Sequence, residues 1–337
     1  MQILFTPLVA LGNLVILNKC IHFKMEKIII TAPLAMFVPT LELGAHSHFS
    51  ILTHLSVCFG RSHTGCFHPF NFIQTPKKRL PQHCEMHCCG DLVSFLSCGM
   101  ILTGLWHLVH LRKTQTSYGR HMRLSPPVRT VPARLAWFLQ EMPALLIPLL
   151  LMLTSHKPSS MGKYLLLGTF CIHYFQRTFV YSPLTRGKPF PLGVMVAAGL
   201  FCSVNGFLQG HYLLHCAQFE DEWTADYRYK TGLLLFCIGM AINIHSDYIL
   251  RNLRKPGEVV YKIPTGGLFE YVSAANYLGE IVEWFGYAVA TWSLPALSFA
   301  LFSLCFIGPR AYYHHRFYQE KFKDYPKLRK ALIPFIF

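Results

Sequence analysis

The sequence is poor in charge. Only 14% of its 337 residues are Asp, Glu, Lys or Arg, whereas soluble domains carry about 25%. This shortage excludes a disordered chain, a coiled coil and most soluble enzymes. The fingerprint G-x-G-x-x-G of soluble dinucleotide-binding folds is also missing, so a fold of that kind is unsupported.

Apolar residues are plentiful instead. They make up 52% of the chain, and the mean hydropathy is +0.33. The formal net charge of +15 falls in short loops between apolar runs rather than on one solvated face, so it does not indicate a nucleic-acid partner. We predict an all-α polytopic membrane protein with seven transmembrane helices. The predicted spans are residues 91–111, 135–154, 164–182, 190–216, 231–250, 274–293 and 295–312.

The loop charges predict an orientation. Lys and Arg gather after the first, third, fifth and seventh predicted spans, while the other loops hold few of them and the fourth loop is acidic. The positive-inside rule then places the C-terminus in the cytosol and the N-terminus of the membrane core in the lumen.

The first 85 residues show no comparable organisation. Their two apolar stretches are short for a membrane span and are broken by Pro7, Pro33 and Pro39, and the first lacks the basic start of a signal peptide. We predict that residues 1–85 are an unassigned extension, either disordered or an artefact of the gene assignment. The membrane domain is expected at residues 86–337.

A His/Cys cluster at residues 83–89 invites a zinc interpretation. A structural zinc site needs a second pair of ligands at a defined spacing, and no such pair follows in the sequence. No metal is therefore expected, with zinc kept as the alternative.

Polar side chains recur inside the predicted spans. An ionisable residue there costs several kcal/mol, so it usually faces a cavity and has a function. Residues three or four apart share one helix face. The resulting stripes are Trp137–Glu141, Tyr174–Arg177–Tyr181, Asn243–Asp247–Arg251–Arg254, Asn276–Glu280 and Arg310–His314–Tyr318.

These stripes suggest a site with two kinds of ligand. The charged stripes of the fifth and seventh spans converge on the cytosolic half, which predicts an anionic cofactor from the cytosol and an apolar substrate from the bilayer. Purely structural roles remain open at this point: helix–helix contacts for Glu141, snorkelling for Arg177 and an internal salt-bridge stripe on the fifth span.

Several longer motifs resemble the steroid 5α-reductase family. They are Trp137-Phe-Leu-Gln-Glu141, His173-Tyr174-Phe, Asn243-Ile-His-Ser-Asp247-Tyr-Ile-Leu-Arg251, Gly266-Gly-Leu-Phe269 and Lys330-Ala-Leu-Ile-Pro-Phe-Ile-Phe337. The resemblance runs from about residue 90 to Phe337 and includes nothing from the first 85 residues.

The resemblance implies an NADPH-dependent enzyme of the endoplasmic reticulum membrane that acts in androgen metabolism. It would reduce the Δ4 double bond of 3-oxo steroids such as testosterone. Glu141 and Tyr174 would hydrogen-bond the steroid 3-carbonyl, so that hydride adds to C5 and a proton to C4. The implied steroid-lining residues are Trp137, Phe201, Trp284 and Phe306. The implied NADPH-binding residues are Arg177, Tyr181, Asn243, Asp247, Arg254, Tyr261, Lys262, Asn276, His314 and Tyr318.

Two positions depart from the family pattern. Lys262 stands where an arginine is expected, which keeps the charge but loses a bidentate donor. Ala197 stands where a basic residue near the ligand is expected, so a contact there is in doubt. The expected partners are a steroid from the bilayer and membrane lipid, with no obligate protein partner.

Two alternatives belong to other classes. A membrane methyltransferase of the isoprenylcysteine type would bind S-adenosylmethionine, which has no phosphate for Arg254 and Lys262 to bind. A seven-helix receptor or transporter would perform no chemistry and would not need titratable stripes on four spans.

Overall fold

The computed structural model describes residues 82–111, 117–122, 128–155, 160–219, 222–253, 258 and 260–337. Contacts divide the chain into two units, Met1–Glu85 and Met86–Phe337. The expectations for residues 1–81 lie outside the described residues, as do the side chains of the His/Cys cluster at 83–89. The helix bundle and its polar network belong to the second unit.

Within the described ranges the unit is built from helices, which confirms the all-α prediction. The long helices are α3 (Gln82–Leu111), α4 (Ala133–Thr154), α5 (Met161–Phe175), α7 (Leu192–His211), α8 (Tyr227–Asn252), α9 (Ala275–Thr291) and α10 (Leu294–Lys321). Short helical segments are η2 (Gly119–His121), η3 (Gln176–Tyr181), α6 (Ser182–Leu184), η4 (Tyr212–Cys216), η5 (Trp223–Ala225) and η6 (Gly267–Glu270).

A long helix lies at each of the seven predicted spans. Five of them are long and apolar enough to cross a membrane: α3, α4, α7 with η4, α8 and α10. As continuous α-helices, α5 and α9 have only 15 and 17 residues, so the count of seven spans stays a prediction. Helix α10 runs nine residues past its predicted end, because its polar last turns continue the helix beyond the apolar run.

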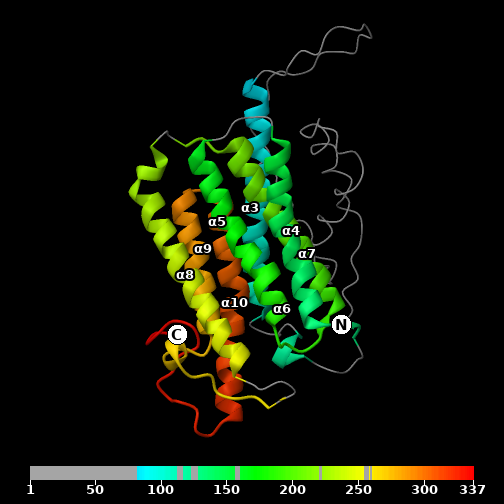
Figure 1. The fold of residues 1–337 in the computed structure, drawn as a ribbon, viewed down its shortest axis with the longest axis vertical. Helices are drawn as coiled ribbons and strands as arrows, with labels where there is room; N and C mark the ends of the chain where they lie inside the picture. The colour runs from blue at the N-terminus through cyan, green and yellow to red at the C-terminus, as the bar shows by residue number, and fades with distance from the viewer. Residues whose placement is uncertain are drawn as a thin grey trace, which may run out of the picture. The chain divides into compact units, whose positions relative to one another are not determined.

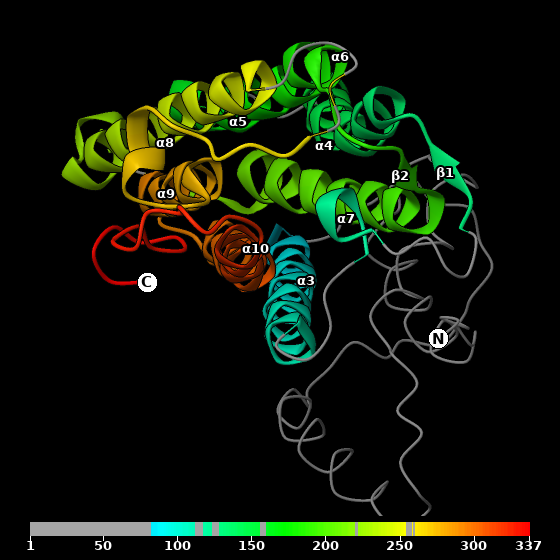
Figure 2. The ribbon, with the colours of Figure 1, turned by 90° about the horizontal axis from the view of Figure 1, so that it is seen from below.

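The long helices run side by side along the long axis of the bundle (Figure 1). Seen from below, α9 and α7 lie in the middle, with α8, α5 and α4 on one side and α10 and α3 on the other (Figure 2). The main apolar core joins side chains of all seven long helices.

Glycines bring α8 and α9 into backbone contact. A Cβ added to Gly239 of α8 would lie 2.6 Å from the Glu283 Cα of α9, and one added to Gly232 would lie 2.6 Å from the Ala290 Cα. Gly279 and Gly286 face α8 in the same way. Small residues two turns apart on both helices allow this close approach, as they do between membrane helices generally.

A small antiparallel sheet joins two loops at one end of the bundle. Strand β1 (Thr130–Val131) pairs with β2 (Phe190–Pro191) just before α4 and α7 begin. The starts of α4, α7 and α9 and the ends of α8 and α10 meet at this end, which is the lower end in Figure 1.

The glycine contact predicts a position-specific effect of one methyl group. We expect Gly239→Ala to lower the yield and thermal stability of the folded protein strongly, because backbone atoms cannot yield to the added Cβ. Gly168→Ala on α5 is the matched control: a Cβ there meets nothing within 4 Å, so the change is expected to be neutral or stabilising by up to about 1 kcal/mol. Thermal melts of both purified variants in detergent provide the measurement, and equal melting temperatures would contradict the packing argument.

Candidate active site

Glu141 and Tyr174 approach the same face of helix α7. Asn205 donates a hydrogen bond to the Tyr174 hydroxyl (3.3 Å), and the Cys202 thiol lies 4.0 Å from the Glu141 carboxylate. Cys202 and Asn205 are three residues apart, so they share a helix face. The two groups predicted to polarise a carbonyl are thus both held against α7, from α4 and α5.

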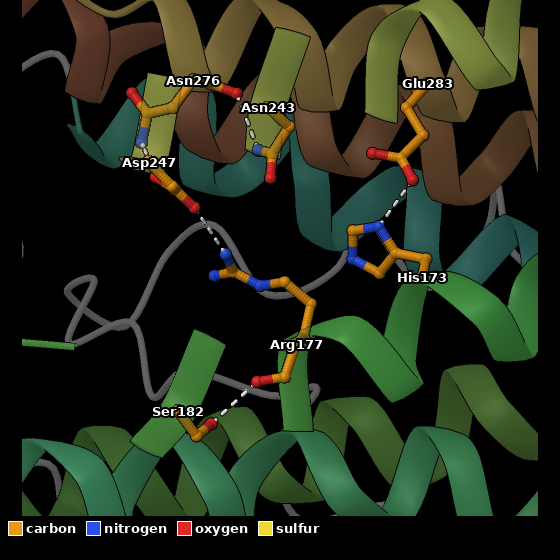
Figure 3. A network of polar contacts seen from close by, with 7 residues as sticks. All are labelled: His173, Arg177, Ser182, Asn243, Asp247, Asn276 and Glu283. Carbon is orange, nitrogen blue, oxygen red and sulfur yellow. Dashed lines mark hydrogen bonds and ion pairs between the residues drawn. The ribbon is translucent and has the colours of Figure 1, made fainter. Parts of the chain in front are cut away.

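Aromatic rings surround the Tyr174 side chain. Its ring contacts those of Phe170, His173 and Trp284. The neighbouring residue His173 forms a buried pair with Glu283, with 2.7 Å between Nδ1 and Oε1 (Figure 3). This pair ties α5 to α9 and restricts the position of Tyr174.

Three of the four predicted steroid-lining residues belong to one aromatic wall. Trp284 contacts Phe299 (4.4 Å between ring centroids), and Phe299 contacts Phe201. Phe201 stacks on Phe302 (4.2 Å), which stacks on Phe306. Helices α7, α9 and α10 together form this wall.

The fourth, Trp137, lies apart from the wall. The Arg177 guanidinium lies 5.0 Å from its ring centroid, and the Tyr181 ring meets it edge-on. Both of those neighbours were predicted to bind the cofactor, so Trp137 sits at the boundary between the two predicted ligands.

A buried polar network joins η3, which follows α5, to α8 and α9 (Figure 3). Arg177 Nη1 lies 3.1 Å from the Asp247 carboxylate, and both side chains are 8% exposed. Asn276 donates to Asp247 (3.2 Å), and Asn243 donates to the Asn276 carbonyl (2.9 Å). Four predicted cofactor residues therefore form one connected network.

The backbone around Arg177 departs from the α-helix that the sequence predicts. Segment η3 is a π-helical turn, in which the hydrogen bonds reach one residue further than in an α-helix. Ser182 donates from its hydroxyl to the Arg177 carbonyl (2.8 Å), and the Arg177 guanidinium lies 3.9 Å from the centre of the Tyr181 ring. Such turns are frequent at functional sites.

A pocket of about 180 Å³ opens beside this network, at the end where the loops meet. Predicted cofactor residues line it: Tyr181, Asp247, Tyr261, Lys262, Asn276 and Tyr318. Cations that were not in that prediction line it too: Arg120, Arg186 and Arg251. The lining has one carboxylate, which Arg177 already neutralises, so the pocket is cationic and suits an anion.

Three cations converge on the Tyr261 ring at the rim of this pocket. Arg120 lies 5.8 Å from the ring centroid, and the Lys188 and Lys321 ammonium groups each lie 5.6 Å away. The Arg120 Nη1 is buried and has no hydrogen-bond partner in the described part of the chain. Lys262, in contrast, pairs with Glu258 at 2.8 Å.

The segment that carries Arg120 is fastened to α9 and α10 by polar contacts. His121 Nε2 lies 3.0 Å from His314 Nδ1, and His314 Nε2 lies 3.2 Å from the Tyr277 hydroxyl. Arg310 donates to Tyr277 (3.1 Å) and lies 3.4 Å from the centre of the Tyr118 ring. His314, a predicted cofactor residue, thus holds a neighbouring wall of the pocket rather than lining it.

Arg254, a predicted cofactor residue, lies outside the described residues. Ala197, where a ligand contact was in doubt, is exposed on α7 and is not among the residues that line the pocket. The sequence does not reveal Arg120 and Arg186 in the pocket lining, or Lys188 and Lys321 beside the Tyr261 ring, because loop residues and an isolated lysine at a helix end have no periodicity that links them to a site.

A bundle of long apolar helices with a buried polar network, an aromatic wall and a cationic pocket at one end defines a multi-pass membrane protein. Residues 188–337 match the sequence profile of the 3-oxo-5-alpha-steroid 4-dehydrogenase family. The chain is 59% identical to 3-oxo-5-alpha-steroid 4-dehydrogenase 2 of Sus scrofa over 226 residues, which cover 66% of this chain and 88% of the relative.

Two relatives from Homo sapiens are similar over the same part. The identity is 58% over 226 residues for 3-oxo-5-alpha-steroid 4-dehydrogenase 2 (66% of this chain, 88% of the relative). It is 52% over 229 residues for 3-oxo-5-alpha-steroid 4-dehydrogenase 1 (67% and 88%). The chain therefore belongs to the 3-oxo-5-alpha-steroid 4-dehydrogenase family of membrane oxidoreductases, and membership favours the reductase over both alternatives.

The His121–His314 contact predicts a loss of stability in acid. Burial, with Arg310 and Arg120 nearby, lowers the pKa of His121 from 6.5 to about 4. Between these two pKa values the unfolded chain therefore binds more protons than the folded chain. The stability that depends on a neutral His121 is complete above pH 6.5 and is lost as the pH falls towards 4.

Thermal melts across this pH range test the effect. We expect His121→Asn to reduce the acid-dependent drop in melting temperature relative to the unmodified protein. His245→Asn, which changes an exposed histidine, is the control and is expected to leave the drop unchanged. The same drop in all three proteins would rule out His121 as its source.

Proposed function

We propose that this protein is an NADPH-dependent steroid 5α-reductase of the endoplasmic reticulum membrane. It takes a 3-oxo-Δ4 steroid from the bilayer, reduces the Δ4 double bond and leaves a 5α-dihydro product. The observation that carries the proposal is the position of Tyr174. It contacts the same face of α7 as Glu141, and it lies three residues before Arg177, whose partner Asp247 lines the cationic pocket.

The pocket residues suit the phosphates of a dinucleotide. Arg120 Nη1, which has no hydrogen-bond partner among the described residues, is suited to a phosphate oxygen. The ammonium groups of Lys188 and Lys321 beside Tyr261 are suited to phosphate oxygens as well. Asn243, Asp247 and Asn276 offer amide and carboxylate groups for the less charged parts of the molecule. When bound, NADPH supplies the hydride for the reduction.

Tyr174 and Glu141 stabilise negative charge on the steroid 3-oxygen. The Tyr174 hydroxyl accepts a hydrogen bond from Asn205, which leaves its own proton free for the carbonyl oxygen. The Glu141 carboxyl group makes the second hydrogen bond to the same oxygen. Polarising the carbonyl in this way makes C5 electrophilic and stabilises the enolate-like transition state.

The positions of the pocket and of the carbonyl-binding pair along the bundle agree with separate binding sites for cofactor and steroid. Glu141 lies eight residues into α4, which begins at the pocket end, so it stands about 12 Å deeper than the first residue of that helix. The aromatic wall of Phe201, Trp284 and Phe306 continues at the depth of the carbonyl-binding pair and excludes water from the reaction. Trp137 lies between the pocket and the wall, beside Arg177.

The basic residues of the pocket also support the proposed orientation. The end of the bundle that the loop charges place in the cytosol, where NADPH is available, carries Arg120, Lys188 and Lys321. The C-terminus is then cytosolic and the N-terminus of the membrane core luminal. The proposal includes a steroid and membrane lipid as partners, and no nucleic acid or obligate protein partner.

The proposed reaction is tested in microsomes that contain the full chain. With testosterone and NADPH we expect 5α-dihydrotestosterone, scored by mass spectrometry. We expect Glu141→Leu and Tyr174→Phe each to lower kcat about 10²–10³-fold, the usual effect of losing one oxyanion donor, while the Kd for NADPH stays nearly unchanged. Tyr164→Phe removes an exposed tyrosine hydroxyl from the same helix as Tyr174 and is the control.

Two results would overturn parts of this assignment. No product from well-expressed protein, together with saturable steroid binding, would favour a receptor. Equal losses of turnover and NADPH affinity in the Glu141 or Tyr174 variants would refute the separation of a carbonyl-binding pair from a cofactor pocket.

The role of Arg120 is tested by cofactor affinity. We expect Arg120→Gln to weaken NADPH binding about 10–100-fold, because a hydrogen bond to a charged group is worth about 1.5–3 kcal/mol. Arg316→Gln removes the same charge from an exposed residue that pairs with Glu320, and we expect little change there. Titration with NADPH and NADH distinguishes the phosphates: a loss for both assigns Arg120 to the pyrophosphate, and a loss for NADPH alone assigns it to the 2′-phosphate. Unchanged affinity for both would exclude Arg120 from the site.

A further inference from the structure

The last residues of the chain expose large apolar side chains. Phe335 and Ile336 are each 77% exposed, and Ile333 and Phe337 are more than 40% exposed. Single exposed apolar residues are common on protein surfaces, but a group of them in one short segment marks a contact surface.

This exposure does not come from a frayed end. The Phe337 amide donates to the Ile333 carbonyl (3.0 Å), and the Leu332 amide donates to the Phe337 carbonyl (2.7 Å), so the segment is closed into a turn. Just before it, Lys330 exchanges backbone hydrogen bonds with Tyr271 (2.9 Å) and Ser273 (2.8 Å). The tail is thereby fixed to the start of α9.

The position of the turn is set by helix α10. From Leu294 to Tyr312 this helix is about 28 Å long, which matches the hydrocarbon thickness of about 30 Å. Polar residues follow Tyr312, so the membrane boundary falls near it. The helix continues to Lys321, about 13 Å further.

The tail then reverses direction and returns to the membrane boundary. The Phe337 ring stacks on the Tyr312 ring (6.4 Å, 10° between planes), and Phe335 contacts Tyr271 (5.7 Å). Figure 1 shows the chain passing below the end of α10 and turning back towards the bundle. The exposed Phe335 and Ile336 therefore lie at the level where α10 leaves the bilayer.

The charges of the returning segment suit a lipid surface. Lys323 and Lys327 are exposed, and Asp324 is the one acidic side chain between Phe322 and Phe337. Lysine stems lie along apolar surfaces while the ammonium groups reach the headgroups, and anionic lipids attract such clusters. Apolar tips flanked by lysines are the composition of interfacial membrane anchors.

We propose that residues 322–337 form an interfacial anchor. Phe335 and Ile336 insert into the bilayer boundary beside α10, and Lys323 and Lys327 bind the headgroups. The occupant of this surface is lipid, and the inference holds whatever reaction the enzyme performs.

The test measures the depth of the tail in the full-length protein in nanodiscs. An environment-sensitive fluorescent amino acid replaces Ile336, and the lipids carry bromine atoms on their acyl chains near the interface, which quench fluorescence on contact. Two matched positions give the limits: Leu102, 62% exposed on the membrane helix α3, and Glu320, exposed on the last turn of α10.

We expect quenching at position 336 to approach that at 102 and to exceed that at 320 at least about twofold. Quenching at 336 no greater than at 320 would overturn the anchor. Intermolecular energy transfer between labelled copies, without bromine quenching, would overturn it in favour of a contact between two copies of this chain.

The lysines are tested with the same label. We expect the combined change Lys323→Gln and Lys327→Gln to lower quenching at 336 in nanodiscs that contain phosphatidylserine, and to have less effect in nanodiscs of phosphatidylcholine alone. An equal effect in both lipids would refute the binding of anionic headgroups by these lysines.

Discussion

The ion pair between Arg177 and Asp247 determines how the rest of the site is arranged. Both side chains are nearly buried, and two charges in such a place are stable only together, because removing one partner costs about 3–5 kcal/mol. Asn276 satisfies the second carboxylate oxygen. The pair holds the π-helical turn after α5 against α8, and so it sets the distance between the wall that bears Tyr174 and the pocket that Asp247 lines.

The glycine contact between α8 and α9 is the packing requirement behind this pair. Gly239 and Gly279 bring the two backbones together one turn away from Asn243. Only at this short distance does the Asn243 amide reach the Asn276 carbonyl, and Asn276 reach Asp247. A larger side chain at either glycine would separate the helices and break both hydrogen bonds. Packing and site geometry therefore depend on the same residues.

Hydropathy was sufficient to predict the helices. Helical spacing predicted which polar residues share a helix face, but not the residues of other helices that they contact. Asn243, Asp247 and Asn276 lie where their spacing predicted because both helices are regular. The sequence did not reveal the π-helical turn at Arg177, since a π turn depends on tertiary contacts such as that of Ser182 with the Arg177 carbonyl. The pairing of Lys262 with Glu258 and the approach of Arg120 to the pocket were equally hidden, because loop residues follow no periodicity. The predicted site residues themselves stay predictions until variants are assayed.

The wall of the pocket around Tyr261 has little regular structure, so its shape must come from contacts with other segments. Gly266 and Gly267 have positive φ values of 91° and 53°, which glycine adopts without strain. The buried Arg329 of the C-terminal tail donates to the Pro264 carbonyl (2.8 Å) and so holds this wall from outside. The tail is fixed in turn to the segment before α9 through Ser273, which contacts His315 and Tyr325 (both 2.6 Å). Three segments, η2, the end of α8 and the C-terminal tail, each hold a different wall, so the pocket exists only when all of them are in place. A substitution in one of these segments, even far in sequence from the lining residues, therefore alters ligand binding as directly as a substitution in the lining.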